Sequence, residues 1–198
     1  MRLVFDCGYP TVSKEWFKNH DWFDFYQDVK EAIPPNMPEA RWHGVIVACF
    51  WDSNHGGNLK DQKSQTGVLI FINKVQIHWY SKSQTTFEVS TFGADFCAMK
   101  TAVEMIEGLR YNLRMFGILV GGSANIYCDN EAVTKNTTIP ESTLEKKHHS
   151  IAYHRCQEAV AAGTIRVAKQ GTRNNLADLF TKVLTACRRR LLLESFTY

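Results

Sequence analysis

The most restrictive feature of this chain is an uninterrupted apolar run over residues 45–51, which is followed directly by Asp52. A strand with one solvent-facing side alternates apolar and polar residues, whereas a continuous apolar run is typical of a central strand covered on both faces. Such a strand requires helices on both sides of its sheet. The run therefore predicts an α/β domain in which Asp52 emerges at the end of a buried strand.

Four further strands follow from similar patterns. Residues 67–72 and 76–80 flank a short connection, which predicts a β-hairpin. Shorter apolar runs at residues 125–128 and 164–168 predict the remaining strands. Because hairpins join antiparallel strands and crossovers join parallel ones, we expect a mixed five-stranded sheet with helices on both faces.

Apolar residues at helical spacing and capping residues predict the helices. The longest spans residues 91–116. Ser142 begins an S-x-x-E capping box that opens another helix, which runs to residue 162 and ends at Gly163. Shorter helices are predicted at residues 131–135 and 175–184.

The chain divides into three parts by composition. Residues 1–43 predict an arm with one short helix, capped by Asp21, and a proline-rich connector. Residues 44–184 contain the predicted α/β domain, and residues 185–198 form a basic tail. Because the first ten residues have the character of a chain interior, we expect Met1 to be a chance start within a polyprotein remnant.

The composition restricts the partners and the compartment. A formal charge of +3 and a pI near 8.5 suit a polyanionic partner. Six scattered cysteines without a C-x-x-C pair favour a reducing compartment and argue against a zinc site. No apolar stretch is long enough for a membrane span or a secretion signal, so we expect a soluble, intracellular, cytoplasmic protein without a membrane partner.

Four aspartates lie where a pair of divalent metal ions would need carboxylates. Asp52 and Asp129 each close an apolar run, whereas Asp95 and Asp178 lie in helix-like segments. Side chains at the carboxyl ends of neighbouring parallel strands converge, and oxygen ligands suit Mg²⁺. Two such ions can clamp a phosphoryl displacement. Each aspartate taken alone also fits an ordinary surface or capping residue.

Several short motifs between residues 43 and 184 are highly specific when taken together. They are FWDSNHGG at 50–57, SQTG at 64–67, WYSKSQ at 79–84, STFGADF at 90–96, YCDN at 127–130, KH at 147–148, YH at 153–154 and NLADLFTK at 175–182. With these motifs the chain resembles the ribonuclease H domain of copia-type retrotransposon Pol polyproteins. The resemblance implies a ribonuclease-H-like fold and endonucleolytic cleavage of the RNA strand of RNA–DNA hybrids by two-metal-ion phosphodiester hydrolysis.

The resemblance also implies roles for the four aspartates. Asp52, Asp95, Asp129 and Asp178 would be the catalytic residues and the ligands of two Mg²⁺ ions, for which Mn²⁺ could substitute. Asp95 stands where the family usually has a glutamate, so its carboxylate is withdrawn by about 1.5 Å. Asn54 stands where many relatives have a second aspartate. The implied partners are an RNA–DNA hybrid and the reverse transcriptase portion of a Pol polyprotein, and a retroelement particle is an alternative location.

Other polar residues have expected roles near this site. His148 is expected to be a proton shuttle, with a structural or solvated histidine as the alternative, as for His149 and His154. A hybrid duplex is recognised through its backbone and 2′-hydroxyl groups, so hydroxyl, amide and basic side chains are expected to contact it. These residues are Ser53, Asn54, Ser83, Gln84, Asn130, Lys147 and Arg173.

Two other functions remain open. A catalytically degenerate copy would keep the fold and act as a nucleic-acid or polymerase interaction module without cutting, which the short Asp95 side chain favours. An integrase-like or resolvase-like enzyme would cut DNA instead, although the hairpin placement and the motifs disfavour it.

Overall fold

The computed structural model describes residues 17, 19–41, 43–58, 60–144 and 149–194. Its strands form one five-stranded sheet in the order β3-β2-β1-β4-β5. The strands are β1 (Val47–Asn54), β2 (Gln65–Ile72), β3 (Val75–Ser83), β4 (Ala124–Cys128) and β5 (Ile165–Lys169). β1 pairs antiparallel with β2 and parallel with β4, so the predicted mixed sheet and its hairpin are confirmed.

Strand β1 lies at the centre of the sheet and is buried on both faces. Cys49 and Trp51 belong to the core cluster on one side, whereas Ala48 and Phe50 belong to the cluster on the other side. Successive side chains of a strand point to opposite faces, so a continuous apolar run supplies both cores at once. This placement confirms the interpretation of residues 45–51 as a doubly covered strand.

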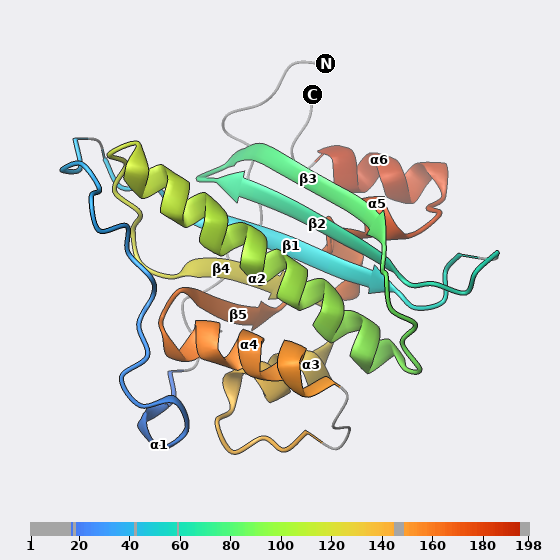
Figure 1. Cartoon of the computed structure of the whole chain (residues 1–198). Helices are drawn as coiled ribbons and strands as arrows, with labels where there is room; N and C mark the ends of the chain where they lie inside the picture. Colours follow the sequence, from blue (N-terminus) through green and yellow to red (C-terminus); the bar gives the residue numbers. More distant parts are fainter. Residues whose placement is uncertain (1–16, 18, 42, 59, 145–148, 195–198) are drawn as a thin grey trace.

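Helix α2 (Thr91–Met115) crosses one face of the sheet, and α4 (Ser150–Ala161) lies beside it (Figure 1). The Ser90 side chain caps α2 by accepting a hydrogen bond of 3.2 Å from the Gly93 backbone amide. Helix α3 (Glu131–Thr138) begins after Asn130, whose side chain accepts from two backbone amides of the first turn. These helices confirm the predicted segments at 91–116 and 131–135.

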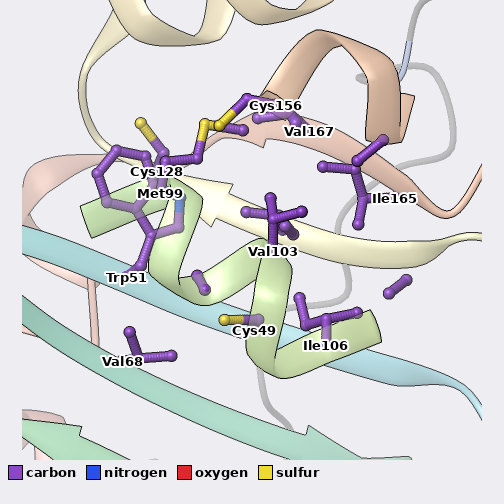
Figure 2. Packing of buried hydrophobic residues seen from close by; sticks show 14 of the residues in the cluster. Cys49, Trp51, Val68, Met99, Val103, Ile106, Cys128, Cys156, Ile165 and Val167 are labelled. Atoms are coloured by element: carbon purple, nitrogen blue, oxygen red, sulfur yellow. The ribbon is translucent and has the colours of Figure 1, made fainter. Parts of the chain in front are cut away.

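The larger core lies between α2 and the sheet. Figure 2 shows Met99, Val103 and Ile106 of α2 in the same apolar cluster as Cys49 and Val68 of the strands. All five side chains are at most 2% exposed. The stripe of apolar residues at helical spacing therefore faces the sheet, as its periodicity predicts.

The opposite face is covered by two helices near the end of the chain, α5 (Asp178–Thr181) and α6 (Ala186–Glu194). The predicted helix at 175–184 is too long at both ends: Asn175 bonds to the Trp51 carbonyl before the helix begins, and α5 ends at Thr181. The segment predicted as a basic tail contains α6, and its Leu192 is buried in the second core. Three leucines follow three arginines here without helical spacing, so the burial of Leu192 beside the exposed Leu191 is decided by tertiary contact rather than by periodicity.

The predicted start of α4 is also wrong. The Ser142 hydroxyl donates to the Asn136 carbonyl at 2.8 Å and bonds to the Tyr153 hydroxyl, so it caps no helix, and α4 begins at Ser150. Residues 145–148 lie outside the described residues. The helix ends before Gly163, which has a φ of +68°, as predicted.

The helix of the arm is shorter than predicted, but side chains of the arm bond to α2 and α4. α1 spans only Phe23–Tyr26, and Gln27 ends it with a φ of +50°. The Tyr26 hydroxyl bonds to His154 Nδ1 at 2.9 Å on α4. Glu31 forms an ion pair of 2.6 Å with Arg110 of α2, and it also accepts from Arg114.

None of the helices in the described part of the chain combines the length and apolar character needed to cross a membrane.

Candidate metal centre

The register of the parallel strands brings Asp52 and Asp129 together. Phe50 of β1 is the partner of Tyr127 of β4 in the last recorded pair of that ladder, and each aspartate lies two residues beyond it. The sequence predicts that Asp52 ends its strand, but β1 continues to Asn54 against β2. It nevertheless lies past the end of the parallel pairing, where side chains from neighbouring strands converge.

Asp178, the first residue of α5, completes a group of three carboxylates. One oxygen atom of each of Asp52, Asp129 and Asp178 lies within 4.8 Å of the others. Asp52 and Asp178 are each only 4% exposed. Three elements that are distant in the sequence therefore supply one buried acidic cluster.

Gly67 on β2, which has no side chain, lets α5 approach Asp52. Gly67 is the partner of Asp52 in the β1–β2 ladder. A Cβ atom at Gly67 would lie 2.6 Å from Thr181 Cγ2 and 3.0 Å from Phe180 Cβ. Glycine is thus required here for close packing between the sheet and the helix that carries Asp178.

Asn175 fixes the turn that precedes Asp178. Its side-chain amide donates to the Trp51 carbonyl at 3.0 Å, and its oxygen accepts from the Ala177 backbone amide at 3.1 Å. Asn175 is fully buried. This one side chain therefore ties the strand that holds Asp52 to the turn that positions Asp178.

Lys182 and Thr181 contact the cluster, although sequence reasoning assigned neither of them a role. Lys182 Nζ lies 3.1 Å from Asp52 Oδ1 and 2.8 Å from Asp178 Oδ1. The Thr181 hydroxyl donates to Asp52 Oδ2. The spacing of four residues between Asp178 and Lys182 was the available signal, since residues at that spacing are neighbours on a helix.

Arg188 is a second cation that sequence reasoning left without a role in this site. Its guanidinium group on α6 lies 3.7 Å from Asp178 Oδ2 and donates to the Thr172 carbonyl at 2.9 Å. Because α6 was predicted as a tail, its arginines were not expected next to a carboxylate.

Burial controls the protonation of these side chains. It raises the pKa of Asp52 to about 6, while the Thr181 hydrogen bond and the Lys182 charge oppose the rise and the charges of Asp178 and Asp129 add to it. For Lys182, burial lowers the pKa, but the hydrogen bond to Asp178 and the charges of both carboxylates raise it overall. The ammonium group therefore stays charged and compensates part of the negative cluster.

Asp95 is held by two hydrogen bonds outside the group of three. The Ser53 hydroxyl donates to Asp95 Oδ1, and Asn130 Nδ2 donates to Asp95 Oδ2 at 2.6 Å. Burial raises the pKa of Asp95, although both hydrogen bonds oppose that rise. Asp95 is thus next to the residue that follows Asp129, and its role as a metal ligand stays a prediction.

The predicted nucleic-acid contacts are spread around this site. Ser53 and Asn130 bind Asp95, and Asn54 Nδ2 donates to the Thr181 carbonyl at 3.0 Å. Ser83 binds Gln65 on the neighbouring strand. Arg173 is exposed in a short 3-10 helix. Their contacts with nucleic acid stay predictions.

Gln84 has a structural position. It is 8% exposed, and its side-chain amide donates to Thr66 Oγ1 at 3.0 Å and to the Ala94 carbonyl at 2.8 Å. These bonds link β2 to the first turn of α2. A contact between Gln84 and nucleic acid also stays a prediction.

The histidines predicted near the site have different positions. His148 and Lys147 lie outside the described residues. His149 is 3% exposed and lies 3.3 Å from Glu88, whereas His154 binds Tyr26 of the arm. The alternative interpretation of His149 and His154 as structural residues agrees with these contacts.

The three carboxylates fit a hard divalent cation. All three donors are oxygen atoms, they come within the span of one ion and its ligands, and two of them are removed from water. Among the described residues, no histidine or cysteine belongs to this group, so its donor set consists of oxygen atoms alone.

The fold is that of ribonuclease H. The chain superposes on the N-terminal ribonuclease H domain of Rv2228c from Mycobacterium tuberculosis with a TM-score of 0.52 and 9% identity, covering 77% of this chain and 99% of that one. It superposes on the LC11 ribonuclease H1 in complex with an RNA/DNA hybrid with a TM-score of 0.51 and 16% identity, covering 68% and 93%.

The sequence is homologous to part of retrovirus-related Pol polyproteins from transposons. It is 32% identical over 143 residues to that from transposon TNT 1-94 of Nicotiana tabacum, covering 70% of this chain, and 28% identical over 151 residues to that from transposon RE2 of Arabidopsis thaliana, covering 72%. The match covers 10% of the length of each of these relatives. No family model matches the chain. The predicted resemblance to a transposon Pol polyprotein is thereby confirmed.

Proposed function

We propose that this chain is a ribonuclease H that hydrolyses the RNA strand of RNA–DNA hybrids with divalent metal ions. The observation that carries the proposal is the convergence of Asp52, Asp129 and Asp178 within 4.8 Å on a ribonuclease H fold. The homology to Pol polyproteins of transposons supports a role in reverse transcription, with the reverse transcriptase portion as a partner, in the cytoplasm or in a retroelement particle.

The chain's own residues would bind and orient the metal. Asp52, Asp129 and Asp178 supply oxygen ligands, and Asp95 is the proposed fourth ligand through which a second ion is held. Thr181 and Asn175 keep Asp52 and the Asp178 turn in place. When bound, Mg²⁺ or Mn²⁺ supplies Lewis acidity for hydrolysis of a phosphodiester.

The substrate class is supported by a solved relative. The LC11 ribonuclease H1 is seen in complex with an RNA/DNA hybrid, and this chain shares its fold. Contacts to the hybrid are proposed for the polar residues around the cluster, and proton transfer is proposed for His148. The proposed contacts are Ser53, Asn54, Ser83, Gln84, Asn130, Lys147 and Arg173.

A degenerate interaction module is the second candidate function. The observation that favours it is that both oxygens of Asp95 accept hydrogen bonds from Ser53 and Asn130. A carboxylate that is engaged in this way has less capacity to bind a metal ion. The module would bind nucleic acid or the polymerase without cutting.

One assay separates these functions. The chain is incubated with a labelled RNA–DNA hybrid, with double-stranded DNA and with double-stranded RNA, each in Mg²⁺, Mn²⁺ or chelator. We expect cutting of only the RNA strand of the hybrid, dependent on metal and lost in Asp52→Asn, while Asp24→Asn, at an exposed position of the arm, cuts normally. Binding without cutting would support the interaction module, and cutting of double-stranded DNA would overturn both.

A further inference from the structure

Lys182 is a cation placed against the proposed metal ligands. Its ammonium group lies 2.8 Å from Asp178 Oδ1 and 3.1 Å from Asp52 Oδ1, so it bridges two carboxylates. The two carboxylate side chains are 5% and 6% exposed, whereas the Lys182 side chain is 34% exposed. The ammonium group therefore approaches the buried pair from the side that opens to water.

A nearby positive charge stabilises the ionised form of the Asp52 and Asp178 pair. Buried carboxylates that lie close together repel each other and have lost their hydration. Among the described residues, the cations that offset this repulsion are Lys182 and, at the longer distance of 3.7 Å, Arg188. Arg188 reaches only Asp178, so Lys182 is the cation that holds both carboxylates.

A divalent cation would use the same oxygen atoms. An ammonium group has three hydrogen-bond donors and no lone pair, so it cannot become a metal ligand and can only be repelled by a metal ion. Lysine carries its charge on a flexible four-carbon chain. Since Lys182 follows the last residue of α5 and is partly exposed, its side chain can turn to solvent without moving Asp178.

We propose that Lys182 is a built-in counter-ion that competes with the divalent metal for Asp52 and Asp178. The inference rests on the proposed metal-dependent function. Metal binding then requires release of the ammonium group, so the chain binds Mg²⁺ more weakly than its three carboxylates alone would. In return, the carboxylate cluster keeps its shape in the absence of metal.

The first test measures Mg²⁺ binding by calorimetry to the full chain, to Lys182→Met and to Lys135→Met. Lys135 is the matched control, because it pairs at 2.8 Å with the exposed Glu131 outside the cluster. We expect about tenfold tighter Mg²⁺ binding for Lys182→Met, which corresponds to ~1.4 kcal/mol, and no change for Lys135→Met. Unaltered or weaker Mg²⁺ binding to a folded Lys182→Met would overturn the inference.

Thermal unfolding in chelator supplies a second readout that involves no metal. Lys182→Met should unfold at a lower temperature than the unaltered chain, because two buried carboxylates lose their shared cation. Added Mg²⁺ should raise its Tm by more than it raises that of the unaltered chain. A variant with an unchanged Tm in chelator would contradict the counter-ion role.

A labelling experiment on the unaltered chain tests the release directly and needs no variant to fold. Lysines are acetylated with a limiting reagent in Mg²⁺ or in chelator, and labelling at each site is read by mass spectrometry. We expect Mg²⁺ to raise labelling of Lys182 severalfold and to leave Lys135 unchanged. Equal or lower labelling of Lys182 in Mg²⁺ would mean that the ammonium group stays in place, and would overturn the inference.

The failure of the inference differs from the failure of the proposed function. If Mg²⁺ binds the unaltered chain and Lys182→Met equally, only the competition by Lys182 is wrong. If neither Mg²⁺ nor Mn²⁺ binds either protein, the proposed metal-dependent function is wrong and Lys182 forms a permanent ion pair. If Mg²⁺ binds only Lys182→Met, the competition is supported in its strongest form.

Discussion

Asn130 Nδ2 donates a hydrogen bond of 2.6 Å to Asp95 Oδ2, which ties the carboxylate on α2 to the residue that follows Asp129. The same asparagine caps α3 with its side-chain oxygen. Asn130 therefore joins the first turn of α3 to the Asp95 side chain on α2. Its two contacts explain how a short aspartate can be fixed near the cluster without being one of the three converging carboxylates.

Lengthening this side chain should increase activity. Asp95→Glu extends the carboxylate by about 1.5 Å, beyond the reach of the present hydrogen bonds to Ser53 and Asn130. We expect a gain of roughly tenfold in Mg²⁺-dependent cleavage of the hybrid, equivalent to ~1.4 kcal/mol of transition-state stabilisation. Single-turnover kinetics measure it, and Glu104→Asp on the exposed side of the same helix is the control. An unchanged or lower rate would show that Asp95 positions Ser53 and Asn130 rather than lacking reach.

Removal of the Asn175 side chain should loosen the site and the fold together. Asn175→Ala leaves the buried Trp51 carbonyl without this hydrogen bond and frees the turn before Asp178. We expect a loss of about 2 kcal/mol in the free energy of unfolding, measured by urea denaturation, and weaker Mg²⁺ binding. Asn174→Ala, at the exposed neighbouring position, should change neither quantity. Loss of stability with intact metal binding would separate Asn175 from the site.

The close approach of α5 to the sheet can be tested at Gly67. Gly67→Ala places a methyl group against Thr181 and Phe180, so α5 must move away from Asp52. We expect destabilisation of roughly 1–3 kcal/mol and a reduced affinity for Mg²⁺. Gly108→Ala is the control, because nothing lies within 4 Å of the added atom, and it should stabilise α2 by about 1 kcal/mol. Normal Mg²⁺ binding in a folded Gly67→Ala chain would argue against a role of this spacing.

The carboxylates should differ in their effect on stability. Asp129 adds negative charge next to Asp52, whereas Asp178 is paired with Lys182 and Arg188. In chelator, Asp129→Asn should therefore raise the free energy of unfolding by about 0.5–1 kcal/mol, while Asp178→Asn should lower it. Urea denaturation measures these changes. Both variants should lose cleavage, and changes of the same sign would contradict this distribution of charge.

The attachment of the arm should depend on pH through Glu31. Burial alone raises the pKa of Glu31, but hydrogen bonds from Arg110 and Arg114 outweigh it and lower the pKa from 4.5 to about 2. A lowered pKa in the folded chain means that the contribution is complete above pH 4.5 and is lost as the pH falls towards 2.

This dependence can be measured with Glu31→Gln. We expect the variant to be less stable by roughly 2 kcal/mol at pH 7, where Arg110 loses its charged partner, and the difference should shrink below pH 4.5. Urea denaturation between pH 7 and pH 3 measures it, with the exposed Glu39→Gln as control. A difference that stays constant down to pH 3 would refute the assignment to the Glu31 charge.

The predictable parts of the fold are those that depend on residue patterns within a short stretch of sequence. The apolar run before Asp52, the stripe on α2 and the glycine after α4 each depend on residues close in sequence. Ser142 shows where this reasoning fails, since its hydroxyl binds Tyr153, which lies on α4, instead of capping a helix. Helix α6 was missed for the same reason, because contact with the sheet determines it.

The positions of three aspartates in the site were predictable, whereas the contacts around them were not. Asp52 and Asp129 could be paired because strand ends meet in a parallel sheet, and Asp178 joined them through the motif at 175–182. The bridging contact of Lys182 and the two hydrogen bonds of Asp95 depend on the distance between layers, which no local pattern contains.

Neighbouring residues of β1 bond to helices on opposite faces of the sheet, since Asp52 binds Thr181 of α5 while Ser53 binds Asp95 of α2. A slip of β1 by one residue would exchange these two side chains and also exchange Cys49 and Trp51 with Ala48 and Phe50 between the two cores. The acidic cluster therefore cannot form in a wrong register while the packing stays intact. A chain that misaligns this strand would fail to fold before it could bind metal at a misplaced site, so selection for a stable core also maintains the spacing of the carboxylates.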